Sequence, residues 1–269
     1  MSAAPRWRTR TCTRPWTRPN TSHRREIVLN LINAEWTKLR TTASFYACTI
    51  VALVLSLLNA ALTGWIYNTM SFPKPLTTAA VITVVLSMYT LVQTSMMVTT
   101  EYRFGMAATN FRVAPKRWQL ALAKLILGAV LVAVVSLVSL VLGFTVADLV
   151  DNNPVGWASN SFVHRALWAV PLGEALLAVL VQGVGWLLRN TAVTVCAGLL
   201  MMLLVERVLP VIPKIGEHVD RFLPFKDLNA FMLNQKAPND NPLVSLGIFV
   251  VWALVAWVAG VVLLHKRDA

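Results

Sequence analysis

Acidic residues are scarce in this 269-residue chain: 12 Asp and Glu stand against 24 Lys and Arg, and all charged residues together make up only 13%. Soluble globular domains carry about 25%. Apolar residues make up 57% and come in uninterrupted runs of about twenty, the length with which a helix crosses a bilayer. The composition therefore argues against a soluble domain and predicts an integral membrane protein.

Cysteine is also rare, with Cys12, Cys48 and Cys196 as the three examples. The number is odd and the last two lie inside apolar runs, so no disulfide framework is indicated. The first apolar run begins near residue 43 and is too long for the core of a signal peptide. We therefore expect no cleaved signal.

Motifs for catalysis are missing as well. The sequence contains no G-x-x-x-x-G-K-[ST] phosphate loop, no H-E-x-x-H and no G-x-S-x-G. The four histidines are too scattered to suggest a zinc site: His23, His164, His218 and His265. We expect no catalytic residue, no metal and no cofactor in this chain.

Long apolar runs predict an all-α membrane protein with six spans. They cover residues 43–65, 77–100, 120–146, 166–188, 191–209 and 243–264. Only Arg189 and Asn190 separate the fourth and fifth spans, which predicts a tight helical hairpin at a membrane surface.

Basic residues decide the orientation. With six spans both termini lie on the same side. The terminal segments, the 101–119 loop, the 189–190 turn and Lys124 together hold 17 of the 24 Lys and Arg, and the opposite loops hold seven. By the positive-inside rule, both termini are predicted to be cytoplasmic.

Residues 1–25 contain seven arginines and no acid, a composition that cannot bury a core, so we expect a disordered cytoplasmic tail. Contact with anionic lipid is a simpler role for it than nucleic-acid binding. The tail also raises the question whether the protein truly starts there. The rest, residues 26–269, is expected to form one transmembrane domain.

Residues 26–42 are typical of an amphipathic helix lying at the membrane surface. One face carries Val28, Leu31, Ile32, Trp36 and Leu39. Glu35 falls within this apolar stripe, where a carboxylate needs a positive partner such as Lys38.

The external 207–242 loop is too apolar for a simple connector. Pro210, Pro213 and Pro224 divide it into short pieces. We predict short helices that lie at the external face or re-enter it.

Four charged residues near or within the spans allow different interpretations. Glu101 is expected in an interfacial ion pair, and Lys124 is expected to reach the cytoplasmic headgroups. Glu174 is an intramembrane carboxylate if its span starts at residue 166, but belongs to a first helical turn if the helix starts at Pro171. Glu206 either supports the external loop or faces a substrate path.

Several short motifs follow one another along residues 26–268. They are Ala34-Glu-Trp-Thr-Lys-Leu-Arg-Thr41, Glu101-Tyr-Arg103, Pro115-Lys-Arg117, Ala123-Lys124, Leu188-Arg-Asn-Thr191, Glu206, Leu223-Pro-Phe225 and Lys266-Arg-Asp268. In this order they resemble the type-2 family of ABC exporter permeases, especially members from high-GC Gram-positive (actinobacterial) species.

The resemblance implies a multi-pass subunit of the bacterial plasma membrane that pairs with a second permease copy, identical or similar. Two copies of a separate ATPase, which would carry ATP and Mg, would dock on the cytoplasmic side. Re-entrant external helices between spans five and six are also implied. A connecting helix would contain Glu35, Trp36, Lys38 and Arg40. A cytoplasmic coupling helix between spans two and three would contain Arg103, Arg112, Lys116 and Arg117.

The implied function is export of an unidentified amphipathic, drug-like or lipid-like substrate. A first alternative is an ATPase-linked membrane sensor or immunity protein that transports nothing. A second is a membrane-embedded enzyme acting on a lipid-linked substrate, with Glu174, Glu206, Asp148 and Asp151 as its acids.

Overall fold

The computed structural model describes residues 21–67, 74–103, 105, 117–151, 156–212, 219–235 and 241–267. All regular secondary structure in these ranges is helical. The predicted all-α class is thus confirmed. Residues 1–20, most of the predicted coupling segment and parts of the external loop lie outside the described residues.

Six helical segments are long and apolar enough to cross a membrane, and each overlaps one predicted span. They are α2 (Ala43–Tyr67), α3 (Lys74–Arg103), α5 (Arg117–Val150), α6 (Ser161–Leu188), the fifth segment Thr191–Val211 and α11 (Pro242–Arg267). The fifth segment consists of α7 (Thr191–Leu200), a π-helical stretch η2 (Met201–Val205), α8 (Glu206–Val208) and η3 (Leu209–Val211).

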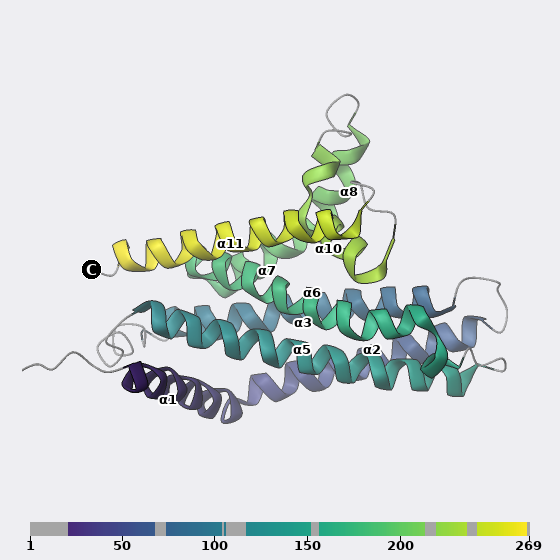
Figure 1. Ribbon diagram of the computed structural model, residues 1–269, viewed down its shortest axis with the longest axis horizontal. Coiled ribbons are helices and arrows are strands. Elements are labelled where there is room, and N and C mark those ends of the chain that lie inside the picture. The colour runs from purple at the N-terminus through teal and green to yellow at the C-terminus, as the bar shows by residue number, and fades with distance from the viewer. Residues whose placement is uncertain are drawn as a thin grey trace, which may run out of the picture.

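Helix α6 is the centre of the bundle. It packs against α3 and α5 on one side and against α11 on the other, while α2 covers α3 and α5 (Figure 1). Accordingly, α6 is the most buried of the six segments, whereas few residues of α2, α7 and α11 are buried in the isolated chain. Those exposed apolar faces are available to lipid or to a partner chain.

Two glycines allow α6 and α11 to touch at the backbone. A Cβ added at Gly183 would lie 2.5 Å from the backbone nitrogen of Trp257, and one at Gly260 would lie 2.6 Å from the carbonyl oxygen of Gly183. Small residues bring membrane helices close enough for dense backbone packing. This contact fixes the sixth span on the central helix.

The predicted hairpin between the fourth and fifth spans is confirmed. Helix α6 ends at Leu188, Arg189 takes the left-handed conformation with φ 54°, and α7 begins at Thr191. The side chain of Asn190 accepts a hydrogen bond from the backbone N–H of Val193, which caps α7. The Arg189 guanidinium lies 4.8 Å from the ring centre of Tyr102 on α3, a cation–π contact.

Helix α1 (Thr21–Arg40) precedes the first span and packs mainly against α5 (Figure 1). It begins five residues before the predicted start at residue 26. Among residues 31–40 the buried side chain is Glu35, whereas Trp36 of the expected apolar stripe is 42% exposed. Within residues 31–40 the carboxylate of Glu35, and not the indole of Trp36, is therefore turned into the bundle.

The described part of the 207–242 loop contains short helices, which confirms that part of the prediction. They are η4 (Asp220–Phe222) and α10 (Pro224–Leu233). Helix α10 packs against α6 and α11, and nearly all of its apolar side chains are buried, including Phe231 and Met232. The loop is thus an integral part of the bundle. A further short helix, η1 (Trp157–Ser159), precedes α6.

Candidate functional site

Four charged side chains from three helices form a buried ion network. Nζ of Lys124 on α5 lies 2.6 Å from Oε2 of Glu35 on α1 and 2.9 Å from Oε1 of Glu101 on α3. Nζ of Lys38 on α1 lies 2.6 Å from the same Glu101 oxygen and 3.3 Å from Oε1 of Glu35. Two lysines and two glutamates thus balance each other in charge and tie α1, α3 and α5 together.

Lys124 is the centre of this network. Its side chain is 1% exposed, and its ammonium also donates to the backbone carbonyl of Met97 at 3.1 Å. Nε2 of Gln182 on α6 donates to the backbone carbonyl of Lys124 at 3.1 Å. All three donors of the ammonium therefore have acceptors, which is what a charge removed from water requires.

This arrangement corrects one prediction. Lys124 was expected to extend toward the lipid headgroups, but it points into the protein between two carboxylates. Its position within span three gave no sign of this, because Glu35 lies 89 residues away in sequence. The prediction that Glu101 forms an ion pair, and that Glu35 requires a positive partner, agrees with the network.

Lys38 forms the outer edge of the network, with 40% of its side chain exposed. Partial burial lowers the pKa of Lys38, but the carboxylates of Glu101 and Glu35 more than offset this, so that its pKa lies above the ordinary value of 10.5. A raised pKa means that the stabilisation by the ammonium is fully present at neutral pH. It is lost only as the pH rises through that raised value.

Of the other residues predicted for the connecting helix and the coupling segment, Trp36, Arg40 and Arg103 lie on α1 and α3, two of the helices that form the network. Arg40 and Trp36 are exposed on α1, and Arg103 is exposed at the last position of α3. Arg117 is the first residue of α5, but its side chain lies outside the described residues, as do Arg112 and Lys116. The network thus lies directly beside the end of α3 from which the predicted coupling segment continues.

Glu174 is a fully buried carboxylate in the middle of the bundle. Its Oε1 accepts from Oγ of Ser87 and its Oε2 from Oγ1 of Thr90, both at 2.7 Å. Helix α6 begins at Ser161, capped by the side chain of Asn160, so Glu174 lies well inside the helix. The alternative of a helix starting at Pro171 is therefore wrong.

The hydroxyl partners of Glu174 were missed in the sequence, although a signal exists. Ser87 and Thr90 continue a row of buried hydroxyl residues along α3 at helical spacing, with Thr83 and Thr94 in the same row. Such a row in an apolar span predicts a polar partner on the facing helix.

Glu206 holds helix α10 in place. Its Oε1 accepts from the backbone N–H of Phe225 at 2.8 Å, and its Oε2 accepts from that of Lys226 at 2.6 Å. These N–H groups belong to the first turn of α10, whose positive end favours a carboxylate. Of the two interpretations of Glu206, support of the 207–242 loop is the one that the geometry favours.

We predict that Glu206→Ala loosens α10, because two buried N–H groups lose their acceptors. The cost is roughly 1–3 kcal/mol of local stability. Hydrogen exchange of the α10 amides measures it, with Glu206→Gln as an intermediate case that keeps one acceptor. Arg207→Ala, at the exposed neighbouring position, serves as the control. Unchanged exchange in Glu206→Ala would show that the cap is dispensable.

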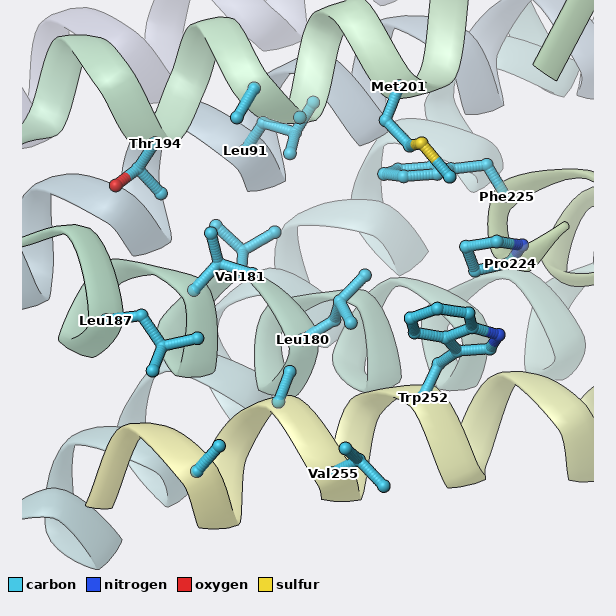
Figure 2. Close-up of a pocket in the computed structure, with 15 residues that line it drawn as sticks. Leu91, Leu180, Val181, Leu187, Thr194, Met201, Pro224, Phe225, Trp252 and Val255 are labelled. Carbon is cyan, nitrogen blue, oxygen red and sulfur yellow. The ribbon is translucent and has the colours of Figure 1, made fainter. Parts of the chain in front are cut away.

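A cavity of about 440 Å³ lies between α6, α7, α10 and α11. Figure 2 shows the apolar side chains of Leu180, Val181 and Val255 turned toward it, with Trp252 and Phe225 near α10. Among the described residues that line it, Thr194 carries the single hydroxyl. The described lining of this cavity therefore suits an apolar molecule.

The described residues do not form a metal site: no three His, Cys, Asp or Glu side chains lie together in these ranges. The buried charged groups of the ion network, Glu174 and Glu206 instead join neighbouring helices. Together with the six apolar segments, these contacts define a multi-pass helical membrane protein.

Residues 31–205, more than half of the chain, match the family model described as ABC-2 family transporter protein. The chain belongs to this family. Its family is that of the ABC transporter permeases, a family of transport subunits. No curated protein sequence shows significant similarity to the chain.

Proposed function

We propose that this chain is the permease of an ATP-driven exporter that moves an amphipathic substrate outward, energised by a separate ATPase subunit. ABC-2 permeases work with an ATPase partner, and the family match supports this assignment. The ATPase would supply ATP and Mg. The permease would act as a pair, with an identical or similar second copy, through the apolar faces that α2 and α7 leave exposed.

The observation that carries the proposal is the buried network at the end of α3. A force applied to Arg103 and the segment after it reaches Glu101 two residues away, and from there Lys124 on α5 and Glu35 on α1. Buried charge pairs have few alternative partners, so the three helices are expected to move together. In this proposal Arg103, Arg112, Lys116 and Arg117 contact the ATPase, and the network transmits the motion.

The apolar cavity supports the choice of substrate class. Its lining accepts hydrocarbon or aromatic groups, and it is bounded by α10, which lies at the proposed external face. Glu206 would keep α10 in position while the helices beside it shift. An amphipathic molecule can place its apolar part there and its polar part toward the external loop.

The proposed orientation places Lys266 and Arg103 in the cytoplasm and Arg207 outside. We predict that Arg207→Cys reacts with a membrane-impermeant maleimide on intact cells, while Lys266→Cys reacts only after permeabilisation. Both positions are exposed. The native Cys12, Cys48 and Cys196 are first replaced by alanine. Labelling of Lys266→Cys on intact cells would contradict the orientation.

Transport itself is tested in proteoliposomes that contain the permease and its ATPase, with a panel of fluorescent amphiphiles. The proposal predicts ATP-dependent movement of at least one of them into the lumen of liposomes whose ATPases face outward. ATP hydrolysis without vectorial movement of any solute supports the sensor or immunity alternative instead. Product formation from a lipid-linked substrate without ATP supports the enzyme alternative.

A further inference from the structure

A second cavity lies beside the ion network. It measures about 380 Å³ and is formed by the end of α1, the start of α2 and the last turns of α3. Helix α1 leads directly into α2 along one edge of the bundle (Figure 1). Leu39, Phe45 and Met96 line the apolar part of the cavity, while Gln93 and Glu101 belong to its polar part. A cavity with both kinds of wall suits an amphiphile.

Two buried acceptors on its wall lack donors within the described residues. Oε1 of Glu101 accepts from Lys38 and Lys124, but Oε2 of Glu101 has no hydrogen-bond partner there. The same holds for Oε1 of Gln93. Both residues line the cavity and are 2% exposed. A buried acceptor without a donor costs free energy, and a ligand that brings a donor to each of them removes that cost.

The charges at this cavity are balanced, which decides against an ionic ligand. Each of the two glutamates of the ion network pairs with both of its lysines. Arg103, which also lines the cavity, already has an interaction partner. An anion would therefore add a negative charge beside two carboxylates, and a cation would add a positive charge beside two ammonium groups. The ligand that fits is neutral.

A hydroxyl group is the neutral group that suits the charged end of the cavity. Its O–H donates to Oε2 of Glu101, and its oxygen accepts from the ammonium of Lys38, which has three N–H donors and gives two of them to carboxylates. Gln93 lies eight residues before Glu101 on α3, roughly 12 Å away along the helix axis. Its Oε1 requires a second donor at that distance from the hydroxyl group, and an amide N–H supplies one without adding charge.

We propose that this cavity binds a neutral lipid that carries hydroxyl groups on its head group and an amide N–H where its chains begin. The head group contacts Lys38 and Glu101, and the amide N–H donates to Oε1 of Gln93. The apolar part of the lipid lies along Phe45 and Met96. Such a lipid joins α1 to α2 and α3 in the place where the cavity separates them.

Binding of this lipid does not depend on the ATPase, on transport or on the orientation of the chain in the membrane. A failure of lipid binding is therefore distinguishable from a failure of the exporter proposal.

The test measures the affinity of the first bound lipid by native mass spectrometry of the purified full-length chain. The detergent is an amine oxide, whose head group has no hydroxyl that would compete. Four probes with chains of equal length are compared. Glucosylceramide has the hydroxyls and the amide N–H, glucosyl diacylglycerol has the hydroxyls alone, phosphatidylglycerol has hydroxyls and a negative charge, and phosphatidylcholine has no donor.

We expect glucosyl diacylglycerol to bind about tenfold more tightly than phosphatidylcholine, because a hydroxyl then bonds a charged acceptor. Glucosylceramide should bind roughly fivefold more tightly still, because its N–H bonds the neutral acceptor on Gln93. Phosphatidylglycerol should bind more weakly than glucosyl diacylglycerol, because its charge has no free counter-charge at the cavity.

Two variants place the lipid in this cavity. Met96→Trp fills the cavity and should lower the affinity for both glucosyl lipids to that for phosphatidylcholine. Gln93→Leu should remove the preference for glucosylceramide over glucosyl diacylglycerol and leave the preference over phosphatidylcholine intact. The control is Gln119→Leu on α5, a buried amide whose Oε1 also has no partner within the described ranges but which does not line the cavity. It should bind all four lipids as the wild type does.

Two results would overturn the proposal. One is equal affinity of the wild-type chain for glucosyl diacylglycerol and phosphatidylcholine, which would mean that no hydroxyl group is recognised. The other is wild-type lipid preference in both cavity variants, which would place the bound lipid elsewhere on the chain. Melting temperatures of the variants equal to that of the wild type exclude unfolding as the cause of any loss.

Discussion

Replacing Lys124 with methionine is expected to cost roughly 3–5 kcal/mol of stability, because it leaves Glu35 and Glu101 buried with only Lys38 between them. Methionine keeps most of the volume of the side chain, so the loss reflects charge rather than packing. Thermal unfolding of the purified chain in detergent measures it. Lys266→Met, at an exposed position on α11, is the matched control and should change little.

A double variant separates this explanation from a general packing defect. Lys124→Met combined with Glu35→Gln removes one charge of each sign and leaves the pair Lys38–Glu101, whose atoms are 2.6 Å apart. The double variant should therefore be more stable than the sum of the two single losses predicts. Strict additivity would mean that the four groups do not act as one network.

The second large effect is expected for Arg103→Glu. This side chain is exposed at the end of α3 and takes part in the proposed ATPase contact. Charge reversal at a complementary interface costs several kcal/mol, so retention of the ATPase should fall by at least about tenfold. The ATPase that co-purifies with a tagged permease under mild conditions is the quantity to measure.

Two controls give the Arg103→Glu result its meaning. Arg207→Glu reverses an exposed charge that lies beside α10, away from the proposed ATPase contact, and should leave ATPase retention unchanged. An unchanged melting temperature of Arg103→Glu excludes unfolding as the cause. If Arg103→Glu retains as much ATPase as wild type, this arginine is not part of the docking surface.

The spans and the hairpin were predictable because they depend on local sequence. A run of twenty apolar residues can be satisfied in a bilayer only as a helix, whatever surrounds it. Arg189 and Asn190 likewise mark a helix end and a helix start within two residues. The short helices around Pro224 follow from the prolines and the apolar side chains in the same way.

The sequence predicted which residues belong to the site, but not which of them contact one another. Glu35, Lys38 and Glu101 were expected to carry function or ion pairs, but which atoms meet depends on how α1, α3 and α5 pack. Lys124 was assigned to the headgroups because a lysine near a span end usually reaches them. Two carboxylates from other helices turn the Lys124 side chain into the protein instead. The local sequence around Lys124 gives no sign of these distant partners.

Glu174 shows that the start of a helix is also difficult to predict from hydropathy. Pro171 favours a helix start, and the apolar run begins only five residues before it. The real cap is Asn160, whose side chain accepts from the backbone N–H of Phe162. Polar residues such as His164 and Arg165 follow this cap and extend the helix beyond its apolar part. Glu174 therefore lies farther from the start of the helix than hydropathy alone indicates.

The measurement that tests the central claim most directly is purification of the tagged chain after co-expression with the ATPase encoded nearest to it. The account predicts a complex with equal numbers of permease and ATPase subunits, two of each, that hydrolyses ATP. Recovery of the permease alone, under mild conditions in which the wild-type chain is folded, would contradict it.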